Sequence, residues 1–380
     1  MENAPMSKKM VIPTDLLPLD GRFGSGPSKV QTQFVSKLAY AAPRFLGTSH
    51  RQPAVRSVVG KMRSGMRDLF ALPDGYEVLL GNGGSTSFWD AASFGLVQNR
   101  AQHCVIGEFS SKFATVNTAA PHLGQPEIIE TAPGQTPTPC RMNTDIDTYC
   151  FVHSETSTGV TMNVERPDGA DGIVLVDATS AAGGLRVDPA QFDVYYFAPQ
   201  KCFGGDGGLW IALVSPDAVA RIESLSQTDR WRPASLDLGI ALEQSRLDQT
   251  YNTLALATVF LLAEQVEWML DGGGLEGMAQ RTDSSATTLY GWAEKHPLVT
   301  PFVSDTRHRS NVTATLDFDA SIDAAAVAKT LRSNGIIDTE PYRKLGRNQL
   351  RIAMFPNIDP SDIERLTACL DYVLERSTTA

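Results

Sequence analysis

Five short apolar runs between residues 77 and 201 are each followed at once by a polar or glycine-rich break. They are EVLLGNGGST (77–86), HCVIGEFS (103–110), TYCFVHSETSTG (148–159), GIVLVDATSAAGG (172–184) and DVYYFAPQK (193–201). Segments with helical character follow several of them, such as SFWDAASFGLV at 87–97. This alternation predicts an α/β fold with a mostly parallel sheet flanked by helices. Ligands of such sheets bind beyond the carboxyl ends of the strands, so the residues just after each run are the first candidates for a site.

The glycines of DGGG at 271–274 follow a long helical stretch and mark a joint in the chain. Beyond the joint, the pattern predicts a smaller α+β unit made of a helix at 275–296, a strand at 311–318, a helix at 321–334, a strand at 349–355 and a helix at 359–377. The pair Asp359-Pro360 suits the start of the last helix, because aspartate caps a helix N-terminus and proline is tolerated in the first turn. We therefore divide the chain into an N-terminal segment plus large domain, 1–274, and a small C-terminal domain, 275–380.

The composition is that of an ordinary globular protein, with 42% hydrophobic residues and a net charge of −10. This acidic balance disfavours nucleic acid or an anionic membrane as the main partner, since both require a basic face. The longest apolar run, LALATVFLLA at 254–263, is about half of what a membrane span needs and predicts a buried helix. Residues 1–18 contain neither the apolar core nor the cleavage pattern of a secretion signal, so a cytoplasmic location is expected.

The cysteines are odd in number and widely scattered, at Cys104, Cys140, Cys150, Cys202 and Cys369. They form no C-x-x-C pair and have no histidine at ligand spacing. We therefore expect neither a disulfide framework nor a metal site.

Two ionisable residues come at the ends of two successive apolar runs. GIVLV ends at Asp177 and DVYYFAPQ ends at Lys201, so a carboxylate and an amine meet at one edge of the sheet if the two strands are parallel neighbours. An ammonium group is costly to keep at the end of a buried strand. Pyridoxal phosphate chemistry requires both groups, because a lysine forms the Schiff base and an acid keeps the pyridine nitrogen protonated.

The segment GNGGST at 81–86 follows a strand and opens a helix. Its glycines let the backbone approach an anion, Ser85 and Thr86 can donate hydroxyl hydrogen bonds, and the helix N-terminus adds a favourable dipole. The Gly-Lys-Ser/Thr of a P-loop is missing, so a nucleoside triphosphate is not the expected ligand. A cofactor phosphate fits this segment better.

Each of these features has a simpler structural explanation when it is taken alone. A lysine at a strand end is more often a solvated surface residue, an aspartate there is more often a cap, and a glycine-rich turn is ordinary in α/β folds. A non-catalytic binding protein of this class would keep the glycine turns but would have no reason for Lys201. The combination of the three features in one order favours a cofactor site.

With these features in place, the chain resembles the phosphoserine aminotransferases, which are class V pyridoxal-phosphate enzymes of fold type I, over nearly its whole length. The matching segments are FGSGPS (23–28), SHR (49–51), NGGST (82–86), GEFSSKFA (107–114), ETSTG (155–159), VDATSAAGG (176–184), APQKCFG (198–204), YNT (251–253) and LRIAMFPN (350–357). The resemblance implies a seven-stranded type of sheet, a small C-terminal α+β domain and a homodimer with active sites shared across the interface.

The resemblance also implies roles for residues around pyridoxal 5'-phosphate. Lys201 would form the Schiff base and move the proton between the substrate Cα and the cofactor C4′, and Asp177 would pair with the pyridinium nitrogen. The other implied contacts are Gly84, Ser85 and Thr86 at the phosphate, Phe109 on the ring, Thr156 and Gln200 at the phenolic oxygen or the phosphate side, and Asn252 and Thr253 from the neighbouring subunit.

Two positions depart from the pattern of the family. Phe109 stands where a tryptophan usually stacks on the pyridine ring, and phenylalanine can still stack with less area. Ser85 replaces an arginine of the family's frequent GGGR, which removes a bidentate phosphate contact. Thr86 or the helix N-terminus would then have to compensate.

For the substrate, Arg351 matches the family's arginine for the α-carboxylate, and a planar guanidinium suits that bidentate task. The residues that the resemblance implies for a distal phosphate or carboxylate are His50, Arg51 and Arg343. The run YRKLGRNQLR at 342–351 is two residues longer than the family's pattern and has Tyr342 where a histidine is common, so Arg347 is the alternative to Arg343.

The expected reaction is the transfer of an amino group from L-glutamate to 3-phosphohydroxypyruvate, giving O-phospho-L-serine and 2-oxoglutarate in serine biosynthesis. The related phosphorylated keto acid of the pyridoxine pathway is a second expected substrate. An alanine–glyoxylate type aminotransferase and a cysteine desulfurase share the lysine and the aspartate, and they remain alternatives within the same fold. A desulfurase also needs a nucleophilic cysteine on a mobile loop, and Cys202 beside the lysine is poorly placed for that role.

Overall fold

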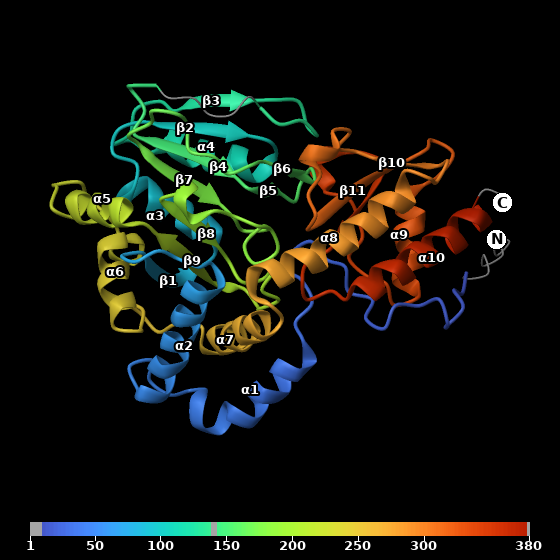
Figure 1. The fold of residues 1–380 in the computed structure, drawn as a ribbon, viewed down its shortest axis with the longest axis horizontal. Coiled ribbons are helices and arrows are strands. Elements are labelled where there is room, and N and C mark those ends of the chain that lie inside the picture. Colours follow the sequence, from blue (N-terminus) through green and yellow to red (C-terminus); the bar gives the residue numbers. More distant parts are fainter. Residues whose placement is uncertain (1–9, 138–142, 378–380) are drawn as a thin grey trace, which may run out of the picture.

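A seven-stranded sheet forms the centre of the larger part of the molecule, with the strand order β1-β9-β8-β7-β4-β2-β3 (Figure 1). The structure is a computed structural model and describes residues 10–137 and 143–377. The strands are β1 (Glu77–Gly83), β2 (Ala101–Val105), β3 (Glu127–Glu130), β4 (Thr148–Val152), β7 (Ile173–Asp177), β8 (Val194–Phe197) and β9 (Gly208–Val214). Among these strands, β9 runs against both of its neighbours, and the pairs from β8 to β3 are parallel. The mostly parallel sheet predicted from the apolar runs is confirmed.

Helices cover both faces of this sheet, which explains why its central strands are apolar on both sides. Val59 of α2 (Pro53–Leu69) and Leu262 of α7 (Leu256–Asp271) pack on one face. Trp89 of α3 (Ser85–Gly95) and Leu242 of α6 (Leu238–Arg246) pack on the other. The remaining elements of this part are α1 (Thr32–Phe45), α4 (Glu108–Ala119), α5 (Pro216–Ser226), β5 (Ser154–Glu155), β6 (Val160–Thr161), η1 (Pro189–Gln191) and η2 (Ala234–Leu236).

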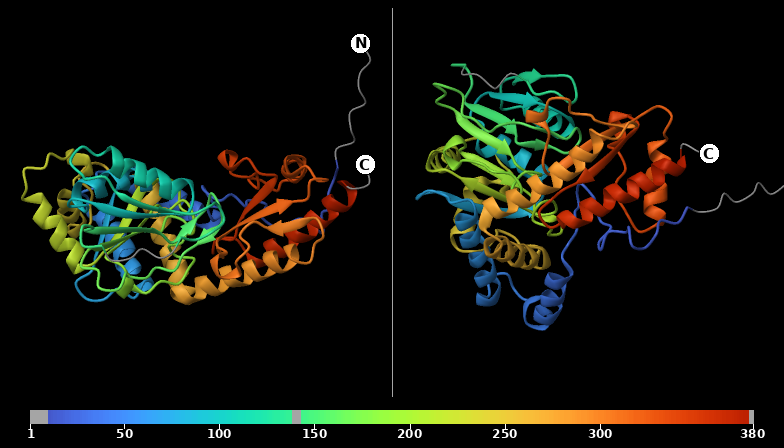
Figure 2. Two further views of the ribbon diagram at one scale, coloured as in Figure 1. Left: turned by 90° about the horizontal axis from the view of Figure 1, so that it is seen from above. Right: turned by 45° about the vertical axis from the view of Figure 1, so that its right-hand side comes forward.

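The C-terminal part builds a second core around a three-stranded antiparallel sheet (Figure 2). Its elements are α8 (Gly274–Ala293), β10 (Val299–Pro301), η3 (Thr306–His308), β11 (Thr313–Phe318), α9 (Ala324–Ser333), η4 (Arg343–Leu345), β12 (Gln349–Ala353) and α10 (Pro360–Ser377). The sequence did not predict β10, which is only three residues long and contains a proline. Asp359 caps α10 as predicted, because its Oδ1 accepts a hydrogen bond from the backbone N–H of Ser361 at 3.0 Å.

The N-terminal segment packs with this second core, so residues 12–23 lie beside elements from the C-terminal part of the chain. Ile12 and Phe23 are buried in the C-terminal cluster, and the Ala353 N–H donates to the Phe23 carbonyl oxygen at 3.0 Å. The start of the described chain, from residue 10, and α10 lie on the same side of the molecule (Figure 1). The loop 24–31 then leads from this core toward the large sheet, and it passes the edge where Lys201 lies.

The sequence-based expectations about membranes and cysteines meet the structure only in part. Across residues 10–137 and 143–377, none of the helices combines the length and the apolar character that a bilayer span requires. Cys104, Cys150, Cys202 and Cys369 are buried and free of disulfide bonds. Cys140 and residues 1–9 lie outside the described part of the chain.

Two glycines provide a matched test of the packing. A Cβ at Gly81 on β1 would lie 2.3 Å from the Trp210 ring on β9, whereas a Cβ at Gly291 in α8 would meet no atom within 4 Å. We expect Gly81→Ala to lower the free energy of unfolding by about 1–3 kcal/mol, because the ring has to move in a filled core. Gly291→Ala is expected to raise it by about 0.5–1 kcal/mol, because alanine favours a helix. Urea denaturation of both variants measures the difference, and a Gly81→Ala protein as stable as the parent would contradict this packing.

Candidate active site

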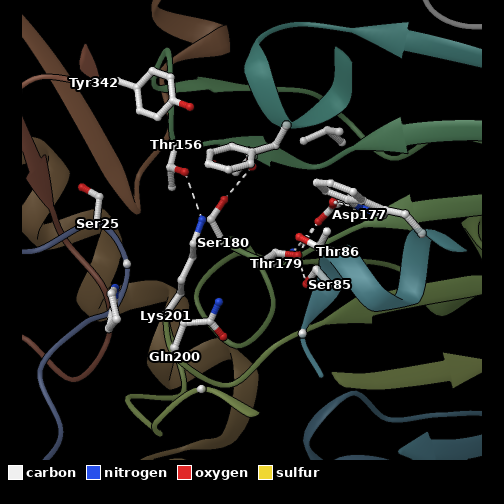
Figure 3. A pocket seen from close by; sticks show the side chains of 18 of the residues that line it. Ser25, Ser85, Thr86, Thr156, Asp177, Thr179, Ser180, Gln200, Lys201 and Tyr342 are labelled. Carbon is white, nitrogen blue, oxygen red and sulfur yellow. Dashed lines mark hydrogen bonds between the residues drawn. The ribbon is translucent and has the colours of Figure 1, made fainter. Parts of the chain in front are cut away.

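Asp177 and Lys201 meet at the carboxyl edge of the large sheet, as their order in the sequence predicted. Asp177 is the last residue of β7, which pairs in parallel with β8. Strand β8 ends at Phe197, so Lys201 lies in the turn after the strand rather than at its last position. Both side chains line a cavity of about 430 Å³ (Figure 3).

Lys201 is a buried amine held from three sides. Its Nζ donates a hydrogen bond to Thr156 Oγ1 at 3.0 Å and lies 5.1 Å from the centroid of the Phe109 ring. Gly26 packs against the aliphatic part of the side chain, and a Cβ there would lie 2.9 Å from the Lys201 Cε. Gly26 also has a φ of +131°, which favours glycine. The lysine is thus confined to one path into the cavity.

Burial lowers the pKa of Lys201 to about 8, and the negative charges of Asp177 and Glu155 oppose this shift. The neutral amine, which is the form that attacks an aldehyde, is therefore well populated near pH 8. In the unfolded chain this lysine has an ordinary pKa of about 10.4, so the folded state binds fewer protons between about pH 8 and 10. Its contribution to stability rises with pH across that window.

A pH profile of cofactor loading tests this shift. We expect the rate constant for the reaction of the apoprotein with pyridoxal phosphate to rise about tenfold per pH unit below pH 8 and to level off above it. Stopped-flow absorbance at a series of pH values gives this profile. A rate constant that keeps rising up to pH 10 would show that Lys201 keeps its ordinary pKa.

The segment predicted to hold the cofactor phosphate, or phosphate cup, lies at the junction of β1 and α3. Gly84 is the N-cap of α3, Ser85 is its first residue, and Thr86 follows; all three line the cavity. The free N–H groups of a helix's first turn and its dipole favour an anion. Ser85 Oγ and Thr179 Oγ1 lie 2.6 Å apart, so the cup is linked to the loop that follows Asp177.

The residues of the cavity fit pyridoxal phosphate. Three lining residues have a buried polar atom without a hydrogen-bond partner, namely Ser25 Oγ, Gln200 Oε1 and Arg351 Nε. Buried polar atoms without a hydrogen-bond partner are rare in native proteins, so these three atoms indicate that a polar ligand binds in the cavity. With an amine, a carboxylate and a helix N-terminus around one space, the cofactor would be held by Lys201, Asp177 and the cup, and Phe109 and Thr156 also line the space as predicted.

Several predicted residues do not line this cavity within one chain. His50 is buried with its Nε2 unpaired, and burial and Arg51 lower the pKa of its imidazole. Arg51 itself is exposed. Asn252 accepts a hydrogen bond from Asn82 Nδ2 at 3.0 Å beside a neighbouring, smaller cavity. Thr253 is exposed and also lies outside the main cavity.

The long run 342–351 places only part of its side chains in the cavity. Tyr342 and Arg351 line it, and the Arg351 Cζ lies 5.5 Å from the Tyr342 ring centroid. Arg343 is exposed at the start of η4. Arg347 forms an ion pair with Asp317 at 2.6 Å. Of the arginines predicted to bind substrate, Arg351 lines the cavity of its own chain, and Arg51, Arg343 and Arg347 do not.

Sequence reasoning missed a further group of lining residues: Ser25, Gly26, Trp89, Thr179, Ser180 and Tyr342. Three of them carry a signal that could have been read. Trp89 follows Ser85 by four residues, about one helical turn, and so shares its face of α3. Thr179 and Ser180 come just after Asp177 at the end of β7, where ligands of such sheets bind. The others reach the site through loops whose course depends on the tertiary fold.

Comparison with known proteins now decides the family. The family description "Aminotransferase class-V" matches residues 28–339. The chain belongs to the class V aminotransferases. A phosphoserine aminotransferase of a Nocardioides species is 56% identical over 373 residues, which cover 97% of this chain and all of that protein. A putative phosphoserine aminotransferase of Mycolicibacterium vanbaalenii is 55% identical, covering 98% of this chain and all of that protein.

Solved structures confirm the fold of this class V aminotransferase. A phosphoserine aminotransferase from Cytophaga hutchinsonii superimposes with a TM-score of 0.87 at 24% identity, covering 93% of this chain and 99% of that one. The phosphoserine aminotransferase from Bacillus circulans subsp. alkalophilus gives 0.82 at 19% identity, covering 93% and 98%. The predicted fold type I of pyridoxal-phosphate enzymes is confirmed.

The thiol next to the lysine argues against desulfurase chemistry. Cys202 is buried, and its Sγ donates to the Ser180 carbonyl oxygen at 3.1 Å. Burial raises the pKa of this thiol well above its ordinary value. The thiolate is the nucleophilic form of cysteine, so this thiol is poorly suited to act as a nucleophile.

Proposed function

We propose that this class V aminotransferase transfers the amino group of L-glutamate to 3-phosphohydroxypyruvate and so makes O-phospho-L-serine. The observation that carries the proposal is the match of almost the whole chain, at 55–56% identity, to relatives named as phosphoserine aminotransferases. The site supports it with a buried lysine, an acid and an arginine around one cavity. The phosphorylated keto acid of pyridoxine synthesis is a second substrate within the proposal.

Arg351 is the group that would receive the α-carboxylate shared by both substrates. Its Nη1 donates to the Thr156 carbonyl oxygen at 3.1 Å, while its buried Nε has no partner. The Tyr342 ring lies against the guanidinium, and this contact restricts its rotation. A guanidinium held in this way can donate two parallel hydrogen bonds to a carboxylate.

When bound, pyridoxal 5'-phosphate supplies an electron-accepting ring and the aldehyde that carries the amino group between the two substrates. Lys201 Nζ lies in the cavity with a lowered pKa, so it can both take and return a proton near neutral pH. Asp177 presents its carboxylate from the same sheet edge. Phe109 and Tyr342, whose ring centroids lie 6.0 Å apart, both line the cavity.

The proposal includes a homodimer in which each site is completed by the other subunit. His50, Arg51, Asn252 and Thr253 do not line the cavity of their own chain. His50 lies next to the backbone of Thr250. The pair His50 and Arg51 is therefore close in the fold to the pair Asn252 and Thr253. Two copies related by a twofold axis would then supply each other with these ligands, including the cations for a distal phosphate.

A subunit mixture tests the shared site. Lys201→Ala and Arg51→Ala homodimers are each expected to be strongly impaired, because each lacks one half of every site. Co-expression of both variants is expected to restore part of the activity, since hybrid dimers contain one site with both native residues. An activity of the mixture no higher than the mean of the separate variants would contradict a shared site.

The division of the chain at 274/275 and a cytoplasmic location also stay proposals. The division falls just after the first residue of α8, which begins at Gly274, and α7 ends shortly before it at Asp271. Ile12 and Phe23 pack with the C-terminal core, so part of the N-terminal segment belongs to the small domain in space.

An assay with L-glutamate and each of three acceptors tests the function directly. We expect turnover with 3-phosphohydroxypyruvate, and formation of O-phosphoserine and 2-oxoglutarate in equal amounts. Glyoxylate is expected to be a poor acceptor, because it has no distal acid. Preferential turnover of glyoxylate would instead assign the chain to the alanine–glyoxylate type, and the pyridoxine-pathway acceptor reports whether both phosphorylated acids are used.

A further inference from the structure

The Asp177 carboxylate is surrounded by hydrogen-bond donors on both of its oxygens. Oδ1 accepts hydrogen bonds from the Thr179 N–H at 2.9 Å and from the Thr179 hydroxyl at 2.5 Å. Oδ2 accepts from the Tyr196 hydroxyl at 3.0 Å and from Trp89 Nε1 at 3.3 Å. The carboxylate is only 3% exposed, so these protein groups replace the water that an ionised acid would otherwise bind.

The two donors to Oδ2 are fixed by rigid elements. Tyr196 lies on the buried strand β8 and stacks on Phe88, with ring centroids 4.4 Å apart. Trp89 lies on α3, one turn beyond the phosphate cup, and stacks on Phe113 with centroids 6.1 Å apart. Trp89 also lines the cavity. Neither ring can move far, so the direction of Oδ2 is set by the fold.

Fixed donors on both oxygens define the plane of the Asp177 carboxylate. A cofactor ring nitrogen benefits from Asp177 only if this carboxylate is correctly oriented. We propose that Trp89 and Tyr196 are positioning residues that hold Asp177 for the ring nitrogen of the cofactor. The inference uses the cofactor of the family and is independent of which keto acid is the substrate.

Conservative variants remove the donors and keep an aromatic ring at each position. Trp89→Phe and Tyr196→Phe each leave Oδ2 with one donor. The probes are pyridoxal phosphate and its 1-deaza analogue, which carries carbon in place of the ring nitrogen. Equilibrium dialysis of the apoprotein gives the dissociation constant for both. We expect each variant to bind pyridoxal phosphate about tenfold more weakly, the effect of one lost hydrogen bond to a charged group, and to bind the analogue with little change.

A second indole–carboxylate bond in the same chain provides the control. Trp292 Nε1 donates to Asp371 Oδ1 at 2.7 Å between α8 and α10, outside the cavity. Trp292→Phe removes the same kind of bond and is expected to leave the affinity for both probes unchanged. Circular dichroism and thermal unfolding identify any variant that fails to fold. If one of Trp89→Phe and Tyr196→Phe does not fold, the other still tests the positioning role, because each variant removes one donor separately.

Two results would overturn the proposal. Wild-type affinity for pyridoxal phosphate in both Phe variants would show that the donors do not matter for the ring nitrogen. Equal weakening of pyridoxal phosphate and of the analogue would show that the rings only maintain the shape of the cavity. A loss confined to the natural cofactor supports the positioning role.

Discussion

Replacing Lys201 with alanine is expected to lower the turnover number with L-glutamate by roughly 10⁴-fold, because the variant loses both the amine that bonds the cofactor and the group that moves the proton. The fold should survive, since a buried ammonium is costly and its removal takes away no large apolar contact. Steady-state rates and the visible absorbance of the bound cofactor measure the effect. Thermal unfolding confirms that the variant is folded.

Lys112 is the matched control, because its Nζ lies 5.4 Å from the centroid of the same Phe109 ring that Lys201 contacts. Its side chain is exposed and it pairs with Glu108. Lys112→Ala is expected to keep near-normal rates, since a surface ion pair contributes little. A fully active Lys201→Ala protein, or an inactive Lys112→Ala protein, would refute the assignment of the catalytic amine.

Replacing Arg351 with alanine should raise the KM for both L-glutamate and the keto acid by about thirtyfold or more, because truncating one partner of a buried charge pair costs about 2–5 kcal/mol. Both substrates carry an α-carboxylate, so the two effects should be similar in size. Steady-state kinetics with each substrate varied in turn gives the two values. An increase for one substrate alone would assign Arg351 to a distal acid instead.

Arg347 provides the comparison for this variant. It is engaged by Asp317 and stacks against Phe302 at 4.7 Å, outside the cavity. Arg347→Ala is expected to leave the KM for L-glutamate unchanged. An increase confined to the phosphorylated acceptor would place Arg347 at the distal phosphate, as the longer run 342–351 allows.

The parts of the site that the sequence predicted are those defined by local patterns. A buried strand followed by a polar residue predicts a sheet edge, which located Asp177 and Lys201. The glycine-rich turn before α3 located the phosphate cup in the same way. The alternation of apolar runs and helical segments predicted the parallel sheet, and the order of the motifs then indicated the family and with it fold type I.

The rest depends on contacts between distant segments, which no local pattern reveals. Gly26 reaches Lys201 only because the N-terminal segment folds back over the large sheet. Tyr196 contacts Asp177 because β7 and β8 are neighbours in one register. Strand β9 was not predicted from the sequence either, and its apolar run does not show that it runs antiparallel, since such a run has the same composition in a parallel strand. The residues expected at a subunit interface do not line the cavity of their own chain, so one chain alone does not test their predicted roles.

The central claim is that Lys201 carries the cofactor, and borohydride reduction tests it most directly. The purified protein is incubated with pyridoxal phosphate, reduced, digested and mapped by mass spectrometry. We predict that the cofactor is trapped on one lysine, in the peptide YYFAPQKCFGGDGGLW at 195–210. A cofactor spread over several surface lysines, or an unmodified Lys201, would contradict the account.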